Sequence, residues 1–283
     1  MRRLPLSLLT VFLVVSSVAP LAAWGRDGHL LAGRVAWLSL NPETQKAVAE
    51  ILPKGDYETL AAASYWADDY ARESEQYRWA NQLHYVNVDP TQDQYVRERD
   101  CRNGRDCVVE AIRRFGAVLS DIDRPVEERR EALFFLVHFV HDLHHPLHVA
   151  HPDGRGGNST LVYWFGREQN LHHVWDTEIP KRFLRRRFPI TQWLSGQAWH
   201  RQASAWQKQG APEEWLQVSD PAQWANESIA LAQQHTYGVV SGMSLTNSYY
   251  EQTASVAMTR IHMAGVRLAA LLETLLDVDR NQN

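Results

Sequence analysis

Hydrophobic residues recur along most of this chain at intervals of three and four positions, the spacing of one face of an α-helix. Strand-like alternation is scarce, and turn residues gather in two stretches, 89–107 and 148–170. Asn41 and Asp220 each stand directly before a proline suited to the first turn of a helix. The pattern predicts helices over residues 30–40, 108–119, 128–144, 221–237 and 249–276. We therefore expect an all-α fold, a compact multi-helix bundle with few or no strands.

The first 23 residues differ in character from the rest of the chain. Arg2 and Arg3 precede an apolar run at 4–18, which gives way to small residues at 19–23. The run is short for a membrane span, and its layout is typical of a cleavable secretory signal, with an uncleaved anchor as the alternative. We expect residues 1–23 to be a signal peptide.

Cleavage after Ala23 would make Trp24 the first residue of a secreted or periplasmic protein without a membrane anchor. No repeat, low-complexity tract or long flexible linker divides the chain after this point. We therefore expect residues 24–283 to form a single domain. We also expect the protein to be a monomer.

The chain holds two cysteines, Cys101 and Cys107. Two are too few for a disulfide scaffold or for a zinc site built from four thiolates. A polar turn, residues 102–106, separates them, so their side chains can meet, and export favours oxidation. We predict a local disulfide between them, with two free thiols as the alternative.

Composition narrows the class of protein further. Of the 283 residues, 45% are hydrophobic and 22% are charged, which is ordinary for a globular protein and excludes a disordered one. The 33 acidic and 29 basic side chains give a formal charge of −4. This excludes a basic surface over the whole domain, so contacts with phosphates must depend on local features. The unusual count is 13 histidines.

Five of these histidines and one aspartate lie within residues 134–148, inside an apolar helical pattern. His138 and Asp142 are four positions apart, which places two potential ligands on one face of a helix. His172 and Asp176 repeat this spacing in a second cluster. Two such pairs on separate helices can converge in the core of a bundle, as they do in other helical metal sites. We interpret them as metal ligands, and a polar network is the alternative.

Other candidate ligands are more ambiguous. His29, Asp68 and His84 each stand alone, and each is compatible with an ordinary structural role as a surface residue, a helix cap or a packed, hydrogen-bonded ring. Spacing ranks His145 above His148, because 145 shares a helical face with the first pair. The proline between these two histidines should end the helix, however, so His148 is free to turn back. Helical geometry leaves the ligand set open.

The types of ligand indicate the metal and the reaction. Imidazoles and carboxylates without thiolates suit zinc or manganese, and the predominance of histidine favours zinc. Seven or more candidate ligands exceed what one tetrahedral ion uses, so we expect more than one ion. Neighbouring divalent ions activate water and stabilise both oxygens of an in-line displacement at phosphorus, which makes phosphate ester hydrolysis the leading reaction class.

The order of the motifs resembles that of the zinc-dependent type I nuclease family, which comprises fungal and plant single-strand-specific nucleases and 3′-nucleotidases with their bacterial relatives. The similarity spans most of the chain after residue 23. It rests on Trp-Gly-x-x-Gly-His at 24–29, Trp-Ala-Asp at 66–68, His-Tyr at 84–85, the histidine-rich run at 138–148, Gly-Gly-Asn at 156–158, Asn-Leu-His at 170–172, Val-Trp-Asp at 174–176 and Trp-Ala-Asn-Glu-Ser at 224–228.

The resemblance implies three Zn²⁺ ions in a cleft, with ligands that carry over position by position. They are Asp68, His84, His138 and Asp142 for one ion, His148, His172 and Asp176 for a second, and the amine and carbonyl oxygen of Trp24 with His29 for a third, to which Asp142 bridges. The expected catalytic residues are Asp68 and Asp142. Only signal cleavage would give Trp24 a free amine, because an uncut chain offers an amide, which is a poor ligand.

The resemblance also implies an activity. A metal-activated water would attack phosphorus in line and leave 5′-phosphate products. The expected substrates are single-stranded DNA and RNA, with double-stranded nucleic acid as a second possibility. The smallest expected substrates are 3′-nucleotides. Tyr85 matches an aromatic residue that stacks on a base, with core packing as the alternative. Asn158 matches a substrate-contacting position, and Arg155 is expected beside it. Asn87 stands where the family often has aspartate, a position expected to bear on base preference.

Two further positions depart from the family, and two rival functions remain. His145 replaces the usual glutamine, and 71–72 is Ala-Arg near the place where some members have lysine. A zinc phospholipase C resembles this fold and metal arrangement but cleaves phospholipid head groups. A glutamate at the position of Asp176 would favour that enzyme. The other rival is an exported zinc-binding protein without catalytic activity.

Overall fold

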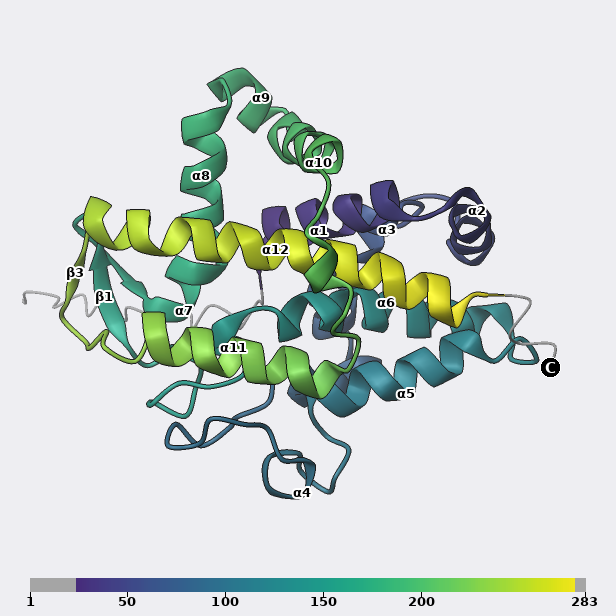
Figure 1. Ribbon diagram of the computed structural model, residues 1–283, viewed down its shortest axis with the longest axis horizontal. Coiled ribbons are helices and arrows are strands. Elements are labelled where there is room, and N and C mark those ends of the chain that lie inside the picture. The colour runs from purple at the N-terminus through teal and green to yellow at the C-terminus, as the bar shows by residue number, and fades with distance from the viewer. Residues whose placement is uncertain (1–23, 278–283) are drawn as a thin grey trace, which may run out of the picture.

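The computed structural model describes residues 24–277, and helices make up most of this part of the chain (Figure 1). The predicted signal peptide, 1–23, lies outside the described residues. The α-helices are α1 (Arg26–Ser39), α2 (Pro42–Ile51), α3 (Leu60–Ala63), α4 (Arg97–Asp100), α5 (Val108–Ser120), α6 (Val126–Leu143), α7 (Leu171–His173), α8 (Ile179–Arg187), α9 (Ile190–Leu194), α10 (Gln197–Gln209), α11 (Pro221–His235) and α12 (Asn247–Leu275). Two π-helical turns, η1 (Ala67–Ala71) and η4 (Val174–Glu178), and three 3₁₀ segments, η2 (Glu75–His84), η3 (Pro146–His148) and η5 (Glu213–Trp215), complete the helical elements.

The five predicted helices are present as α1, α5, α6, α11 and α12, and the all-α expectation is confirmed. Two of the predicted starts show the expected capping. The side chain of Asn41 accepts a hydrogen bond from the backbone N–H of Thr44 (2.8 Å), and that of Asp220 accepts one from Ala222 (3.1 Å). In each case proline occupies the first helical position, where no backbone donor is needed.

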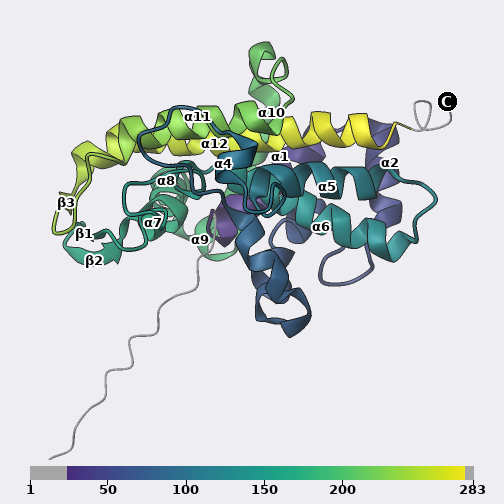
Figure 2. The same ribbon diagram turned by 90° about the horizontal axis from the view of Figure 1, so that it is seen from below.

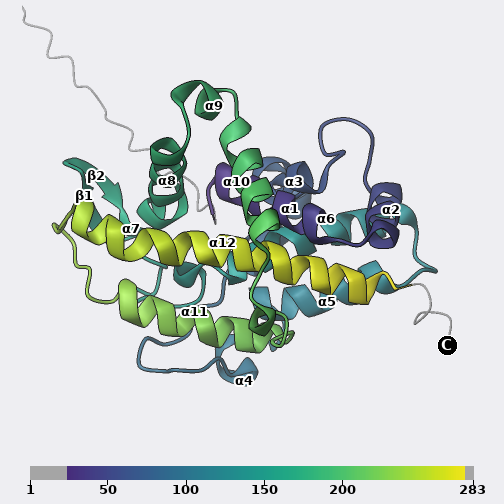
Figure 3. The ribbon, with the colours of Figure 1, turned by 45° about the horizontal axis from the view of Figure 1, so that its top comes forward.

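Helix α12 runs through the length of the molecule and packs against α1, α5 and α6 (Figures 1 and 3). In the view of Figure 2, α11 and α12 lie along one side, and α5 and α6 lie beneath them. The crossing of α12 over α1 depends on Gly265, because a Cβ there would come within 2.6 Å of the carbonyl oxygen of Ala32. A larger residue at 265 would push α12 and α1 apart.

Buried apolar side chains form two clusters. One lies around α5 and α6 and includes Phe135 and Phe139, while the other contains Trp24 and Trp175 and joins α1, η4, α8 and α12. The histidine-rich end of α6 adjoins both clusters. Polar ligands are therefore held between two rigid apolar bodies, which is how a fold fixes side chains for a site.

The described residues contain one small sheet, and two of its three strands lie in the stretch 148–170 that the turn residues had marked as loop. Strand β1 (Leu161–Trp164) pairs antiparallel with β2 (Arg167–Asn170) and parallel with β3 (Ser244–Leu245). A hairpin turn at 165–166 joins β1 and β2, with Gly166 at a φ of 82°. The strands are too short for their alternation to stand out from the surrounding turns.

The predicted disulfide between Cys101 and Cys107 is confirmed, with their Cα atoms 5.2 Å apart. It closes the polar turn that precedes α5. Among residues 24–277, no helix combines the length and the apolar character that a membrane crossing requires.

Candidate metal centre

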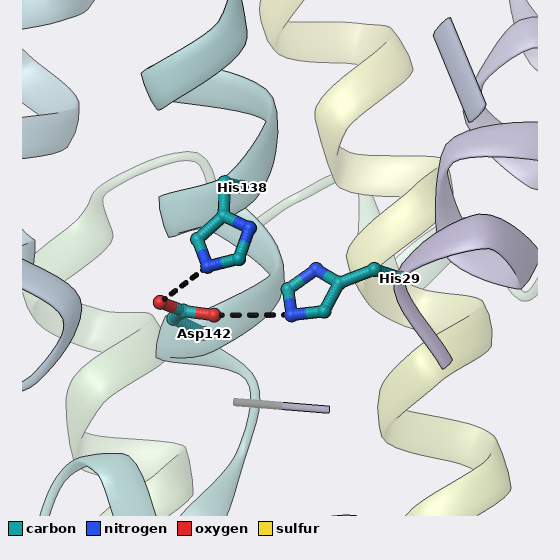
Figure 4. A group of neighbouring side chains, drawn as sticks. All are labelled: His29, His138 and Asp142. Atoms are coloured by element: carbon teal, nitrogen blue, oxygen red, sulfur yellow. Dashed lines mark ion pairs between the residues drawn. The ribbon is translucent and has the colours of Figure 1, made fainter. Parts of the chain in front are cut away.

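Helix α6 places two candidate ligands at its buried C-terminal end. His138 and Asp142 are one turn apart and fully buried, and His138 Nε2 lies 3.3 Å from Asp142 Oδ2. The helix ends at Leu143, shortly before Pro146 opens η3, so His148 leaves the helical path and turns back. Figure 4 shows the two side chains of α6 pointing toward His29.

The potential ligand atoms form three buried groups, and within each group they all lie within 4.8 Å of one another. The groups are Asp68 with His84 and His138, His29 with His138 and Asp142, and His148 with His172 and Asp176. The structure thus brings together all eight predicted side-chain ligands.

Segments that are distant in sequence meet in the first group. Asp68 comes from the π-helical turn η1, and His84 ends η2. His84 Nδ1 lies 3.0 Å from Asp142 Oδ2 and 3.9 Å from Asp68 Oδ1, while His138 Nε2 lies 3.7 Å from that same Asp68 oxygen. Four side chains from three segments therefore surround one small volume.

The second group adds the first turn of α1. His29 Nε2 lies 3.5 Å from Asp142 Oδ1, and its ring stacks on that of His138 with centroids 4.1 Å apart (Figure 4). Trp24 is buried close by, with its indole edge against His145. The backbone N–H of the next residue, Gly25, donates to the carbonyl oxygen of Asp176 (2.9 Å). Trp24, the residue directly after the predicted cleavage point, therefore lies beside the ligand groups.

Backbone carbonyls orient three of the rings. Nδ1 of His138 lies 2.8 Å from the carbonyl oxygen of Ser64, Nδ1 of His148 lies 2.7 Å from that of His84, and Nδ1 of His172 lies 2.7 Å from that of Gly156. Because a carbonyl oxygen only accepts hydrogen bonds, each Nδ1 must carry the proton, and each Nε2 presents a lone pair to the group. This is the outer-shell arrangement that fixes the tautomer of metal-binding histidines.

Two of these lone pairs face each other. His148 Nε2 and His172 Nε2 lie 3.2 Å apart, and Asp176 Oδ2 lies 3.9 Å from the second ring. Two nitrogen lone pairs at this distance repel unless a positive charge lies between them. A divalent cation coordinated by both rings and the carboxylate removes the repulsion, so the residues present fit a metal ion.

The electrostatics of the aspartates lead to the same conclusion. Burial raises the pKa of Asp142 well above its ordinary value, and the charge of Arg72 opposes this only in part. Burial, with the charges of Asp68 and Asp142, likewise raises the pKa of Asp176, and burial raises the pKa of Asp68 to about 6. Within residues 24–277, Asp142 Oδ1 and Asp176 Oδ1 have no hydrogen-bond partner. Bound cations would compensate these carboxylates.

A cavity of about 410 Å³ adjoins the ligand groups. It is lined by His84, His148 and His172 and by all four residues predicted to bind substrate, namely Tyr85, Asn87, Arg155 and Asn158. The Gly-Gly-Asn loop that borders it is ordered by Asp153, whose carboxylate accepts hydrogen bonds from three backbone N–H groups of the loop. Gly156 has a φ of 59°, and a Cβ there would collide with the carbonyl oxygen of Leu147.

Two residues of the site were missed by the sequence interpretation. Arg72 lines the cavity and forms an ion pair with Asp68, four positions earlier in the chain. That spacing on a helix was a usable signal. Asp153 is the second, and its place just before a glycine-rich turn was the corresponding signal.

The Trp-Ala-Asn-Glu-Ser motif holds the end of α6 in place. Ser228 Oγ donates to the carbonyl oxygen of Leu143 (2.6 Å), and Arg260 Nε donates to that of His144 (3.1 Å). Glu227 accepts hydrogen bonds from both Arg260 (2.6 Å) and Arg267 (2.6 and 2.8 Å). The motif thereby fixes the position at which the chain leaves the ligand-bearing helix.

Comparison with known proteins agrees with this geometry and with the resemblance of the motifs. The S1/P1 Nuclease family model matches residues 24–277. The chain is 32% identical to Endonuclease 1 of Arabidopsis thaliana over 295 aligned positions, which cover 97% of this chain and 94% of that protein. It is 29% identical to Nuclease P1 of Penicillium citrinum, over 87% of this chain and 95% of that protein, and 25% identical to Nuclease S1 of Aspergillus oryzae, over 97% and 98%. The chain therefore belongs to the S1/P1 nuclease family.

Proposed function

We propose that this protein is a zinc-dependent nuclease that hydrolyses phosphodiester bonds of single-stranded DNA and RNA to 5′-phosphate products and also acts as a 3′-nucleotidase. The observation that carries the proposal is a set of three buried His/Asp groups, two of which contribute histidines to the lining of one cavity that also holds an aromatic ring and two arginines. Membership of the nuclease family supports it.

Three zinc ions are proposed, one for each buried group, with the ligands expected from the resemblance. When bound, such ions supply an activated water and positive charge for in-line displacement at phosphorus. Asp142, which lies near His29, His84 and His138, is the residue suited to two groups at once. Trp24 is proposed to complete the group of His29 through its amine and carbonyl oxygen.

The other residues of the cavity would bind and orient the substrate. Tyr85 is half-buried and offers a ring face for stacking on a base, which is tolerant of sequence and favours unstacked single strands. Arg72 carries a guanidinium group suited to a phosphate oxygen. Asn158, held by a hydrogen bond from its side chain to the carbonyl oxygen of Arg155, and Asn87 offer polar groups for the base or sugar.

We further propose that residues 24–283 are one domain with Trp24 as its first residue, secreted or periplasmic, and monomeric. The disulfide between Cys101 and Cys107 supports an oxidising compartment. The burial of Trp24 beside the ligand groups supports a chain that begins at this residue.

A direct test follows product formation and metal content together. Purified protein should hydrolyse single-stranded DNA, RNA and 3′-AMP, lose activity with a chelator and regain it with Zn²⁺. Release of head groups from phosphatidylcholine without hydrolysis of nucleotides would favour the phospholipase C reading. Bound zinc without turnover of any phosphoester would favour the non-catalytic zinc-binding protein.

A further inference from the structure

Helices α8, α9 and α10 form an arch, residues 179–209, that projects from the body of the molecule (Figures 1 and 3). The arch holds seven Lys or Arg and no Asp or Glu, although acidic residues outnumber basic ones in the chain as a whole. Five of the seven fall within α8, at Lys181, Arg182, Arg185, Arg186 and Arg187. Positive charge is thus concentrated on one projection of an acidic protein.

Most of this charge is not neutralised. In the part of the chain that the structure describes, Arg185, Arg186 and Arg187 form no ion pair, and all three are exposed. Among the seven cations of the arch, Lys181 alone forms an ion pair within residues 24–277, at 3.7 Å from Glu178. The three arginines are therefore available to a partner that brings negative charge.

Aromatic rings hold several of the cations without neutralising them. The guanidinium of Arg185 lies 3.9 Å from the ring centre of Trp193, and that of Arg182 lies 3.8 Å from the ring centre of Phe165. A stacked guanidinium uses its flat face, which leaves the N–H groups of the exposed Arg185 available for phosphate oxygens, whereas Arg182 donates from Nη2 to Asn247 Oδ1 (3.0 Å). The stacking reduces the conformational entropy that these side chains lose on binding.

Helix α8 and strand β1 both follow directly, along the chain, after residues of the candidate active site. Helix α8 begins just after Asp176, and strand β1 begins just after the loop of Asn158. The outer side of this hairpin exposes Tyr163 (42%) and Phe165 (36%), and Arg182 covers the second of these rings. Exposed rings beside a row of cations form a platform for stacked bases and their phosphates.

We propose that α8 and the outer side of β1 bind the phosphate backbone of single-stranded nucleic acid outside the catalytic cavity. The surface would hold polymeric substrate while the cavity takes the scissile linkage. A mononucleotide bound in the cavity is too short to reach this surface as well. The inference rests on the proposed nuclease function, but binding by the arch is measurable without catalysis.

The test compares two triple variants of equal charge. R185Q/R186Q/R187Q removes three exposed cations of α8, and K46Q/K54Q/R105Q removes three exposed cations elsewhere. Circular dichroism checks the fold of each. Affinity is measured by fluorescence anisotropy with a labelled phosphorothioate oligo-dT, which resists hydrolysis, over a range of salt concentrations.

The α8 variant should bind the oligonucleotide about tenfold more weakly than the native protein. Its plot of log affinity against log salt should be shallower by about 2, since each lost phosphate contact on a single strand contributes roughly 0.7 to the slope. KM for single-stranded DNA should rise with kcat unchanged, and the kinetics on 3′-AMP should not change. The control variant should behave as the native protein.

Equal losses in the two variants, or an unchanged α8 variant, would overturn the inference. A membrane surface is the competing partner, because the tip of the arch exposes Ile190 (64%) and Leu194 (70%). If phosphatidylglycerol vesicles bind the native protein and I190S/L194S abolishes this, while neither triple variant alters oligonucleotide binding, the arch serves membranes instead. Oligonucleotide binding through the arch without any hydrolysis would support the inference and refute the proposed function.

Discussion

The backbone N–H of Leu147 donates a hydrogen bond to Nδ1 of His145 across 3.1 Å. Nδ1 is therefore an acceptor, and burial, followed by the charges of His148 and His172, lowers the pKa of this ring so that it stays neutral. The single ring proton must then lie on Nε2, which faces Asp176 Oδ1 at 3.5 Å. A protonated nitrogen has no lone pair for a metal, so His145 would orient Asp176 and leave ligation to His148.

His145→Gln should therefore retain the full metal content, because the glutamine amide can take over the contact with Asp176. His145→Leu should retain fewer ions at low zinc, since losing an outer-shell partner typically weakens metal affinity by about 10- to 100-fold. Mass spectrometry of the metal content after dialysis measures both. Asp176→Asn is the control that should lose an ion, and a comparable loss in the glutamine variant would make His145 a ligand.

Asp142→Asn should lower kcat by at least about 100-fold on every phosphoester substrate, because the amide weakens a residue whose carboxylate lies within 3.9 Å of four histidines of the site. Helical content, measured by circular dichroism, should change little. Glu43→Gln on the exposed start of α2 is a matched neutralisation that should have no effect. Full activity in the Asp142 variant would contradict its assignment.

Tyr85→Ala should raise KM for nucleotide substrates by about 5- to 150-fold, the range that corresponds to a stacking contribution of about 1 to 3 kcal/mol. Tyr85→Phe keeps the ring and should leave KM close to that of the native protein. Steady-state kinetics on 3′-AMP and on a phosphodiester without a base separate stacking from packing. If alanine impairs both substrates equally, Tyr85 acts only in packing.

Adding one alanine before Trp24 in the mature protein should reduce the zinc content by one ion per chain. The addition converts the amine of Trp24 to an amide and leaves every side-chain ligand in place. The comparison is the same protein beginning at Trp24, with metal content measured in parallel. An unchanged zinc count would exclude the amine as a ligand.

Glu227 should make stability depend on pH in the acid range. Burial alone would raise its pKa, but hydrogen bonds and charge from Arg267 and Arg260 outweigh burial and lower it. A depressed pKa in the folded state stabilises the protein above the unfolded value of about 4.5, and this stabilisation is lost as pH falls through the folded pKa.

Thermal unfolding of native protein and Glu227→Gln should therefore differ most near neutrality, by about 2 kcal/mol, because the variant leaves two buried arginines without a counter-charge. The difference should shrink as the pH is lowered below about 4.5. A difference that stays constant down to strongly acid pH would mean that the carboxylate charge is not what stabilises this network.

Much of the site followed from local spacing. The pairs His138/Asp142 and His172/Asp176 were visible because four-residue spacing fixes a shared helix face. The sequence could not decide whether His145 or His148 is the ligand, because that choice depends on where the chain turns after Pro146. Nor could the sequence reveal that the carbonyls of Ser64 and Gly156 orient the rings, since these contacts join residues far apart in the chain.

The fold shows the same division. Long helices such as α5 and α12 hold many apolar residues at helical spacing and were predicted closely. Helices α8 and α10 were missed because basic and polar residues fill most of their positions, and few apolar residues mark their buried faces. The hairpin of β1 and β2 was missed because four-residue strands depend on pairing more than on pattern.

The single disulfide connects residues only six positions apart, so it restrains one short loop. The three ligand groups, in contrast, join the start of α1, η1, the end of η2, α6, η3, α7 and η4, which extend from residue 29 to residue 176. Metal ions held there would act as cross-links of long range. In this protein the resistance of the fold to heat and proteases would then depend on the supply of metal more than on oxidation. A shortage of metal would shorten the lifetime of the folded protein as well as remove its activity.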